Sequence, residues 1–212
     1  MVDTIFLSLR RPTMHTILFS KEKKMKRFVA CTVAAVMMLG TTVVSAEEVK
    51  SGLQSGASVG AFNVEKLAGA DTDGVSIGQN LCYRCKNGGR PQVMVFTRST
   101  DAKVVNLIDQ LDAAISKNSK KQLRAFVNYL GDDKRSATKG AKELAGKSKA
   151  KNVPFVLPNE FENGPDNYGL NADVEVTIIL AKGLKVQASH AFKVGKDVNV
   201  DAVVKDLSKI LN

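Results

Sequence analysis

The chain has 212 residues, 44% of them hydrophobic and 25% charged, and a formal net charge of +10 at pH 7. This length and composition allow one substantial buried core, so the sequence predicts one domain or two small ones. The positive charge is not arranged as a basic stripe with interleaved aromatic residues, and we therefore expect no nucleic-acid partner.

Residues 1–46 have the order of a secretory signal peptide. A cluster of Lys and Arg between positions 21 and 27 precedes the uncharged residues 28–44, and a Val-Ser-Ala sequence ends at Ala46. This order of basic, apolar and then small residues is typical of a secretory signal peptide, in which signal peptidase reads the small residues, and the apolar run is shorter than the ~20 residues of a membrane span. We expect an exported protein (periplasm, cell envelope or secreted), with membrane contact only through this segment if it stays uncleaved. Met25 is an alternative start, which would make residues 1–24 an extension.

Removal of residues 1–46 changes both the charge and the cysteine content. The segment holds seven of the 31 Lys and Arg residues and two of the 21 Asp and Glu residues, so the remainder carries about +5. Cys31 leaves with it, whereas Cys82 and Cys85 remain. Residues 47–58 are rich in Ser and Gly and predict a flexible lead-in, and residues 59–212 predict one α/β domain.

The hydrophobic pattern after residue 59 predicts strands and helices in a regular order. Residues 61–64 and 75–77 predict a short N-terminal hairpin, and residues 92–96, which are apolar after Gln92, predict a strand covered on both faces. Parallel strands joined by helices and completed by an antiparallel hairpin predict a mixed sheet with helices on both faces. The later predicted elements are a helix carrying Val104 to Ile115, a strand at 123–130, a helix ending near Lys149, strands at 153–157, 174–181 and 184–192, and a helix at 200–211.

Four short segments match the strands and hairpin of a known superfamily. They are residues 60–64, residues 89–96, the Tyr-Gly-Leu at 168–170 before the strand at 174–180, and residues 181–184. Over roughly residues 57–211 the chain resembles the thioredoxin-like superfamily, in the branch of peroxiredoxins (AhpC-TSA-like) and exported thiol-disulfide proteins. The resemblance implies a thioredoxin-like mixed central sheet flanked by helices, with an N-terminal β-hairpin extension. It also implies thiol-disulfide chemistry with protein or small-molecule thiols as partners.

The chain departs from this superfamily where its members carry catalysis. Members place the reactive cysteine just after the central strand, at a helix N-terminus, where backbone N–H groups lower the pKa of the thiol. Here residues 97–100 are Thr-Arg-Ser-Thr, and the P-x-x-x-T-x-x-C pattern of peroxiredoxins is absent. The proline that faces the cysteines in the superfamily is missing from the matching residues 173–177.

The C-x-x-C pair, Cys82 and Cys85, lies before the central strand instead. Because ligands of open α/β sheets gather at the carboxyl ends of the strands, we expect this pair at the far end of the sheet from the usual site. Export favours a disulfide between the two cysteines. That disulfide either stiffens the entry to the central strand or acts as a relocated redox pair. In the second case the cations of Arg84, Lys86 and Arg90 favour a thiolate, with Cys82 as the nucleophile by analogy.

Metal and haem sites are the weaker alternatives for the pair. C-x-x-C supplies two of the four ligands that zinc uses, and His190 is the one histidine after residue 46, on a predicted sheet face. Lys86 stands where a haem-attachment motif needs histidine. We therefore expect no metal and no cofactor.

Two functions remain open from the sequence. The first is an exported thiol-disulfide oxidoreductase that uses Cys82 and Cys85 as a displaced catalytic pair. The second is a non-catalytic thioredoxin-fold binding or structural module in which the same two residues form a structural disulfide.

Overall fold

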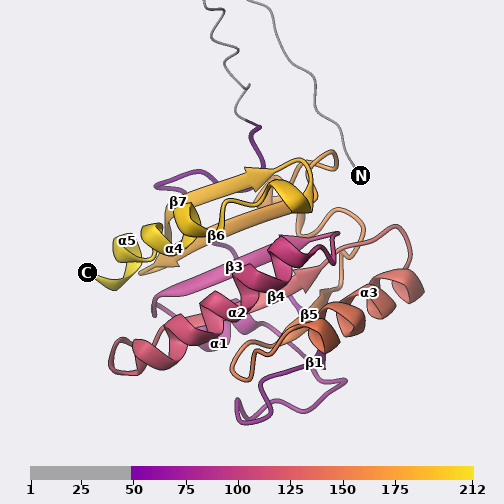
Figure 1. The fold of residues 1–212 in the computed structure, drawn as a ribbon, viewed down its shortest axis with the longest axis horizontal. Coiled ribbons are helices and arrows are strands. Elements are labelled where there is room, and N and C mark those ends of the chain that lie inside the picture. The colour runs from indigo at the N-terminus through magenta and orange to yellow at the C-terminus, as the bar shows by residue number, and fades with distance from the viewer. Residues whose placement is uncertain (1–48) are drawn as a thin grey trace, which may run out of the picture. The chain divides into compact units, whose positions relative to one another are not determined.

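A mixed sheet organises residues 49–212, the part of the chain that the computed structural model describes (Figure 1). The predicted signal peptide, residues 1–46, lies outside the described residues. The strand order is β2-β1-β5-β4-β3-β6-β7, in which β3, β4 and β5 are parallel and the other neighbours are antiparallel. The strands are β1 (Val64–Ala68), β2 (Asn80–Leu81), β3 (Gln92–Thr97), β4 (Arg124–Tyr129), β5 (Phe155–Pro158), β6 (Val176–Lys182) and β7 (Lys185–Phe192).

The long helices gather on one face of this sheet. In Figure 1 they lie in front of the strands, whereas the short helix α1 lies behind them. Asp101 and Asp133 begin α2 and α3, and each accepts a backbone N–H of the first turn, as capping residues do. The helices are α1 (Tyr83–Asn87), α2 (Ala102–Lys117), α3 (Lys134–Lys147), α4 (Val200–Asp206) and α5 (Ser208–Leu211).

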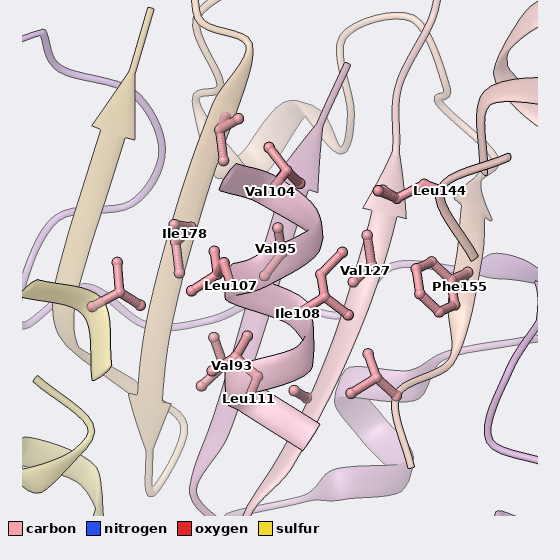
Figure 2. Packing of buried hydrophobic residues seen from close by; sticks show 14 of the residues in the cluster. Val93, Val95, Val104, Leu107, Ile108, Leu111, Val127, Leu144, Phe155 and Ile178 are labelled. Atoms are coloured by element: carbon pink, nitrogen blue, oxygen red, sulfur yellow. The ribbon is translucent and has the colours of Figure 1, made fainter. Parts of the chain in front are cut away.

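The larger core packs between the sheet and α2, α3 and α4 (Figure 2). Val104, Leu107, Ile108 and Leu111 share one face of α2 because their spacing follows the helical period, and all four are fully buried. Burial of each of these side chains stabilises the fold by roughly 1.5–3 kcal/mol relative to exposure. The strand residues beneath them in Figure 2 include Val93, Val95, Val127 and Ile178.

Aromatic residues form a second core on the opposite face. The Phe62 ring lies 4.9 Å from that of Tyr168, 5.9 Å from Phe96 and 6.1 Å from Phe126, measured between centroids. Tyr83 of α1 stacks on Phe126 at 5.7 Å. Both faces are therefore covered, as predicted, but irregular chain and the five-residue α1 cover this one.

The predicted N-terminal hairpin is present with later boundaries. The paired residues are Val64–Leu81 and Glu65–Asn80, whereas the sequence pattern places the strands at 61–64 and 75–77. The shift arises from Lys66, which is only 1% exposed although a lysine normally marks a surface position. A buried ammonium needs a counter-charge, and here Asp73 supplies it at 2.9 Å.

Residues 51–59, which include most of the predicted lead-in, run beside β6 and β7. The hydroxyl oxygens of Ser51 and Thr177 are 2.6 Å apart. The Gly56 N–H donates to the Val186 carbonyl at 2.8 Å. Such bonds occupy backbone groups that an edge strand leaves unpaired. This stretch is thus packed against the domain, whereas the sequence predicts flexibility there.

Candidate functional site

Cys82 and Cys85 are joined by a disulfide at the start of α1, with their Cα atoms 5.2 Å apart. Cys82 is the N-cap residue of the helix, and its sulfur accepts the backbone N–H of Cys85 at 3.0 Å. Cys85 is exposed and Cys82 is half-buried. The two cysteines therefore differ in exposure, and the Cys82 sulfur is the one that accepts this backbone N–H.

The disulfide lies before β3 in the chain, and α1 leads to the amino end of that strand. The Gly89 carbonyl accepts the N–H of Gly183 in the β6–β7 turn, and the Pro91 carbonyl accepts the N–H of Arg124 at the start of β4. Both contacts fix this connection at the amino ends of the parallel strands. The pair is therefore at the end of the sheet that the chain order predicts.

The carboxyl end of β3 holds helix-starting residues in place of a thiol. The Thr97 hydroxyl oxygen accepts the Ser99 N–H at 3.0 Å, and Asp101 then caps α2. Arg98 donates from Nη2 to the Glu162 carbonyl. Residues 97–100 therefore shape the turn into α2, at the position where the superfamily carries its reactive cysteine.

A buried ion pair fixes α1 from one side. Lys66 Nζ bonds to Asp73 Oδ1 at 2.9 Å and to the carbonyls of Ala70 and Val75 at 2.9 and 2.8 Å. The Tyr83 hydroxyl donates to Asp73 Oδ2 at 2.5 Å. Tyr83 directly follows Cys82, so this network positions the residue next to the disulfide.

Two pKa shifts describe the electrostatics of this network. Burial opposes ionisation of Asp73, but the hydrogen bonds from Lys66 and Tyr83 outweigh it and lower the pKa of Asp73 below its ordinary value. Burial, and then the hydrogen bond to Asp73, raises the pKa of Tyr83 above its ordinary value. At neutral pH Asp73 is therefore a carboxylate and Tyr83 a neutral phenol.

Arg84 fixes α1 from the other side. Its Nε and Nη2 atoms donate to the Val59 carbonyl at 3.0 and 2.5 Å. Val59 belongs to the segment that runs beside β7, so the short helix connects the N-terminal segment to the sheet. A five-residue helix has little stability of its own, and these tertiary contacts hold it in place.

His190 lies away from the cysteine pair. It belongs to β7, and its Nε2 is 3.1 Å from Asp206 Oδ2 of α4, which packs on the face opposite α1. Within residues 49–212 no three His, Cys, Asp or Glu side chains gather as metal ligands would. The same residues contain no helix with the length and hydrophobicity needed to cross a bilayer.

Sequence reasoning identified the cysteines but missed the residues that surround them. Lys66, Asp73 and Arg124 reach α1 or its neighbourhood from β1, the β1–β2 loop and β4. The one local signal is Lys66 itself, a lysine at an inward position of a short apolar strand.

The solved structures similar to this chain include thiol:disulfide interchange proteins and peroxiredoxins. The thiol:disulfide interchange protein DsbE from Chlorobium tepidum aligns with a TM-score of 0.55 and 15% identity, over 76% of this chain and 99% of its own. AhpC from Mycobacterium tuberculosis aligns with a TM-score of 0.53 and 16% identity, over 76% and 99% of the two chains. A thiol:disulfide interchange protein from Bacteroides sp. gives 0.51 and 14%, over 76% and 91%.

No family model matches the sequence, and no curated protein does so either. The structural likeness establishes the fold: the chain is thioredoxin-like, with a mixed sheet, flanking helices and an N-terminal hairpin. The fold predicted from the sequence is confirmed.

Proposed function

We propose that the protein exchanges its Cys82–Cys85 disulfide with thiols. The observation that carries the proposal is the difference between the sulfurs: Cys85 is exposed, whereas the sulfur of half-buried Cys82 accepts an N–H at 3.0 Å. A thiolate can reach the exposed residue, and the hydrogen bond stabilises negative charge on the sulfur that leaves. The thioredoxin-like fold and the thiol:disulfide interchange proteins among the similar structures support this chemistry.

The exchange proceeds in two balanced steps. An external thiolate attacks the Cys85 sulfur, the bond between the two sulfurs breaks, and its electron pair leaves with Cys82 as a thiolate. A second external thiolate attacks the external sulfur of the mixed disulfide and releases Cys85 as a thiolate. Two external thiols become one disulfide, and the protein pair gains two electrons.

The same steps in reverse reduce an external disulfide, with Cys85 attacking and Cys82 resolving. This assignment differs from the analogy in the sequence analysis, which makes Cys82 the nucleophile. Exposure favours Cys85 as the attacking residue, because an attacking sulfur must reach its target. Positive charge supports either thiolate: Lys86 follows Cys85, and Arg90 Nη1 donates to the Lys86 carbonyl at 3.2 Å.

A non-catalytic module with a structural disulfide is the second candidate function. One observation favours it: the position after β3 holds Thr97 to Thr100 and no cysteine. In this candidate the disulfide reinforces α1, which Tyr83 and Arg84 also hold.

Equilibration with glutathione redox buffers separates the two candidates. We expect a reduction potential for Cys82–Cys85 above about −300 mV, since structural disulfides of secreted proteins lie below that value. A pair that stays oxidised in excess reduced glutathione, or a double serine variant that keeps full thiol exchange, contradicts the proposal.

The single variants test the roles of the two sulfurs. In Cys85→Ser the Cys82 thiol keeps the backbone N–H donor of residue 85, so its alkylation by iodoacetamide should titrate at a lower pH. In Cys82→Ser the remaining Cys85 thiol lacks that donor and should titrate at a higher pH. Equal titration curves contradict the assignment of Cys82 as the stabilised leaving group.

We also propose that the protein acts outside the cytoplasm. The order of residues 1–46 supports export, and a disulfide persists in an oxidising compartment. Expression of the full chain in a bacterium, followed by cell fractionation and intact mass measurement, should give an exported form cleaved after Ala46. A full-length product confined to the cytoplasm contradicts export.

A further inference from the structure

A cavity of about 450 Å³ opens beside α1, at the amino ends of β3 and β4. It is bounded by the β1–β2 loop, α1, the end of α2 and the residues before β5. Its volume is in the range of small-molecule binding sites. Its polar lining residues include Lys86, Asn87, Arg90, Arg124 and Asn152.

Three cations line this cavity without a carboxylate partner. Within residues 49–212 no Asp or Glu oxygen lies within 4.0 Å of the charged nitrogens of Lys86, Arg90 or Arg124. Arg90 Nε donates instead to Gln122 Oε1 at 2.7 Å, and Arg124 Nη1 donates to the Leu123 carbonyl at 3.0 Å. These neutral partners orient the guanidinium groups and leave their charge uncompensated.

The one acidic residue in the lining cannot take up this charge. Asp73 is the acidic residue among the described lining residues. Its Oδ1 accepts hydrogen bonds from Lys66 Nζ and the Val75 N–H, and its Oδ2 accepts one from the Tyr83 hydroxyl. The buried ammonium of Lys66 already balances its charge. The cavity therefore presents a net positive lining that an anion would complement.

The cavity and the disulfide share helix α1. Tyr83, Lys86 and Asn87 line the cavity, and Cys85 is bonded through the chain to Lys86. Neither cysteine lines the cavity, but the Lys86 N–H donates to the Cys82 carbonyl at 2.9 Å, so Lys86 lies one helical turn after Cys82 and next to Cys85 in the chain. Binding of the anionic part of a thiol here would hold its sulfur near Cys85.

We propose that this cavity binds the carboxylates of a small dianionic thiol, whose sulfur then exchanges with Cys85. The inference rests on the proposed function, because it names the substrate class of the same cysteine pair. The bound thiolate attacks the Cys85 sulfur, and the electron pair of the broken bond leaves with Cys82, as in the first step above. The cations select the substrate by charge.

Three small thiols of different charge test this selection. Mercaptosuccinate carries two carboxylates, 2-mercaptoethanol carries no charge, and cysteamine carries an ammonium group. The rate constant for reducing Cys82–Cys85 is measured with each thiol and divided by its rate constant with a small uncharged disulfide, which removes intrinsic differences in reactivity. We expect the normalised rate constant of mercaptosuccinate to exceed that of 2-mercaptoethanol about tenfold at low salt. This mercaptosuccinate excess should fall as the ionic strength rises.

Charge-neutral variants connect the preference to the cavity. Arg124→Gln and Arg90→Gln should each lower the mercaptosuccinate excess by about two- to fivefold. Arg135→Gln makes the same change of charge on the exposed surface of α3 and should leave the excess unchanged. Succinate, which has the carboxylates without the thiol, should inhibit reduction by mercaptosuccinate but not by 2-mercaptoethanol.

The outcomes separate this inference from the function on which it rests. If none of the three thiols reduces the pair, the proposed function itself fails. If all three reduce it with equal normalised rates, or if both cavity variants keep the full mercaptosuccinate excess, the cavity does not select the thiol and only the inference is overturned.

Discussion

The Tyr83 hydroxyl donates a 2.5 Å hydrogen bond to Oδ2 of Asp73, and Tyr83 is the residue that follows Cys82. Asp73 simultaneously pairs through Oδ1 with the buried Lys66. The helix that carries the disulfide is therefore held by a charge in the β1–β2 loop. Changes to this loop should alter the cysteine pair without touching either cysteine.

Replacement of Tyr83 by Phe removes this hydrogen bond and keeps the aromatic ring. We expect Tyr83→Phe to lower the free energy of unfolding by about 1.5–3 kcal/mol, because the lost acceptor is charged. Tyr129→Phe is the matched control: its hydroxyl donates to the neutral Arg98 carbonyl at 3.1 Å, and its loss should cost about 0.5–1.5 kcal/mol. Urea denaturation of both oxidised variants gives the comparison, and an equal loss in the two contradicts a special role for Asp73.

The Lys66–Asp73 pair predicts a dependence of stability on pH. The folded-state pKa of Asp73 is below its ordinary value of 3.8, so the pair stabilises the fold at pH values above the unfolded pKa. That stabilisation is lost as the pH falls below about 4 and through the folded pKa. Asp73→Asn leaves Lys66 buried without a counter-charge and should lower stability by about 3–5 kcal/mol at pH 7.

The difference between wild type and Asp73→Asn isolates this contribution. Hydrogen bonds from Ser136 and Lys147 also lower the pKa values of Asp133 and Glu143, but these residues are the same in both proteins. In urea unfolding, the difference in free energy of unfolding between the two proteins should be smaller at pH 3 than at pH 7. A difference of the same size at both pH values contradicts ionisation of Asp73 as its source.

The elements predicted well are those with a strong local pattern. Residues 93–96 are apolar without interruption, and β3 is indeed buried on both faces. The periodic residues Val104 to Ile115 predict α2, and in the structure Asp101 caps this helix. The β1–β2 hairpin lies further along the chain than predicted, because the burial of Lys66 depends on Asp73, seven positions after it.

The site was predicted only in part, because only its cysteines belong to a local sequence pattern. The C-x-x-C spacing identifies Cys82 and Cys85, and the chain order places them before the central strand. The cations of the cavity come from separate elements, since Lys86 lies on α1 and Arg124 on β4. Only the parallel pairing of β3 with β4 brings them together, and no local pattern in a single sequence records that pairing.

Two glycines of α3 should respond to alanine with opposite signs. A Cβ at Gly140 would overlap the Tyr129 ring, whereas a Cβ at Gly146 meets nothing within 4 Å. Gly146→Ala should stabilise the protein by about 0.5–1 kcal/mol through helix propensity. In Gly140→Ala overpacking should outweigh that gain and destabilise by about 1–3 kcal/mol. Thermal unfolding measures both, and stabilisation by Gly140→Ala contradicts the close contact between α3 and β4.

The disulfide should contribute little to global stability, as expected for a redox pair rather than a staple. Cross-linking four residues removes about 2 kcal/mol of loop-closure entropy from the unfolded chain, compared with about 3 kcal/mol for a 15-residue loop. The double variant Cys82→Ser, Cys85→Ser should therefore fold and lose no more than about 2 kcal/mol.

A second double variant controls for the helix cap. Ser at position 82 can still accept the N–H of residue 85, whereas Ala cannot, so Cys82→Ala with Cys85→Ser should lose about 1 kcal/mol more. Urea denaturation of both variants beside the oxidised wild type gives the two differences. A double serine variant that does not fold, or that loses much more than 2 kcal/mol, would favour a structural disulfide over an exchanging one.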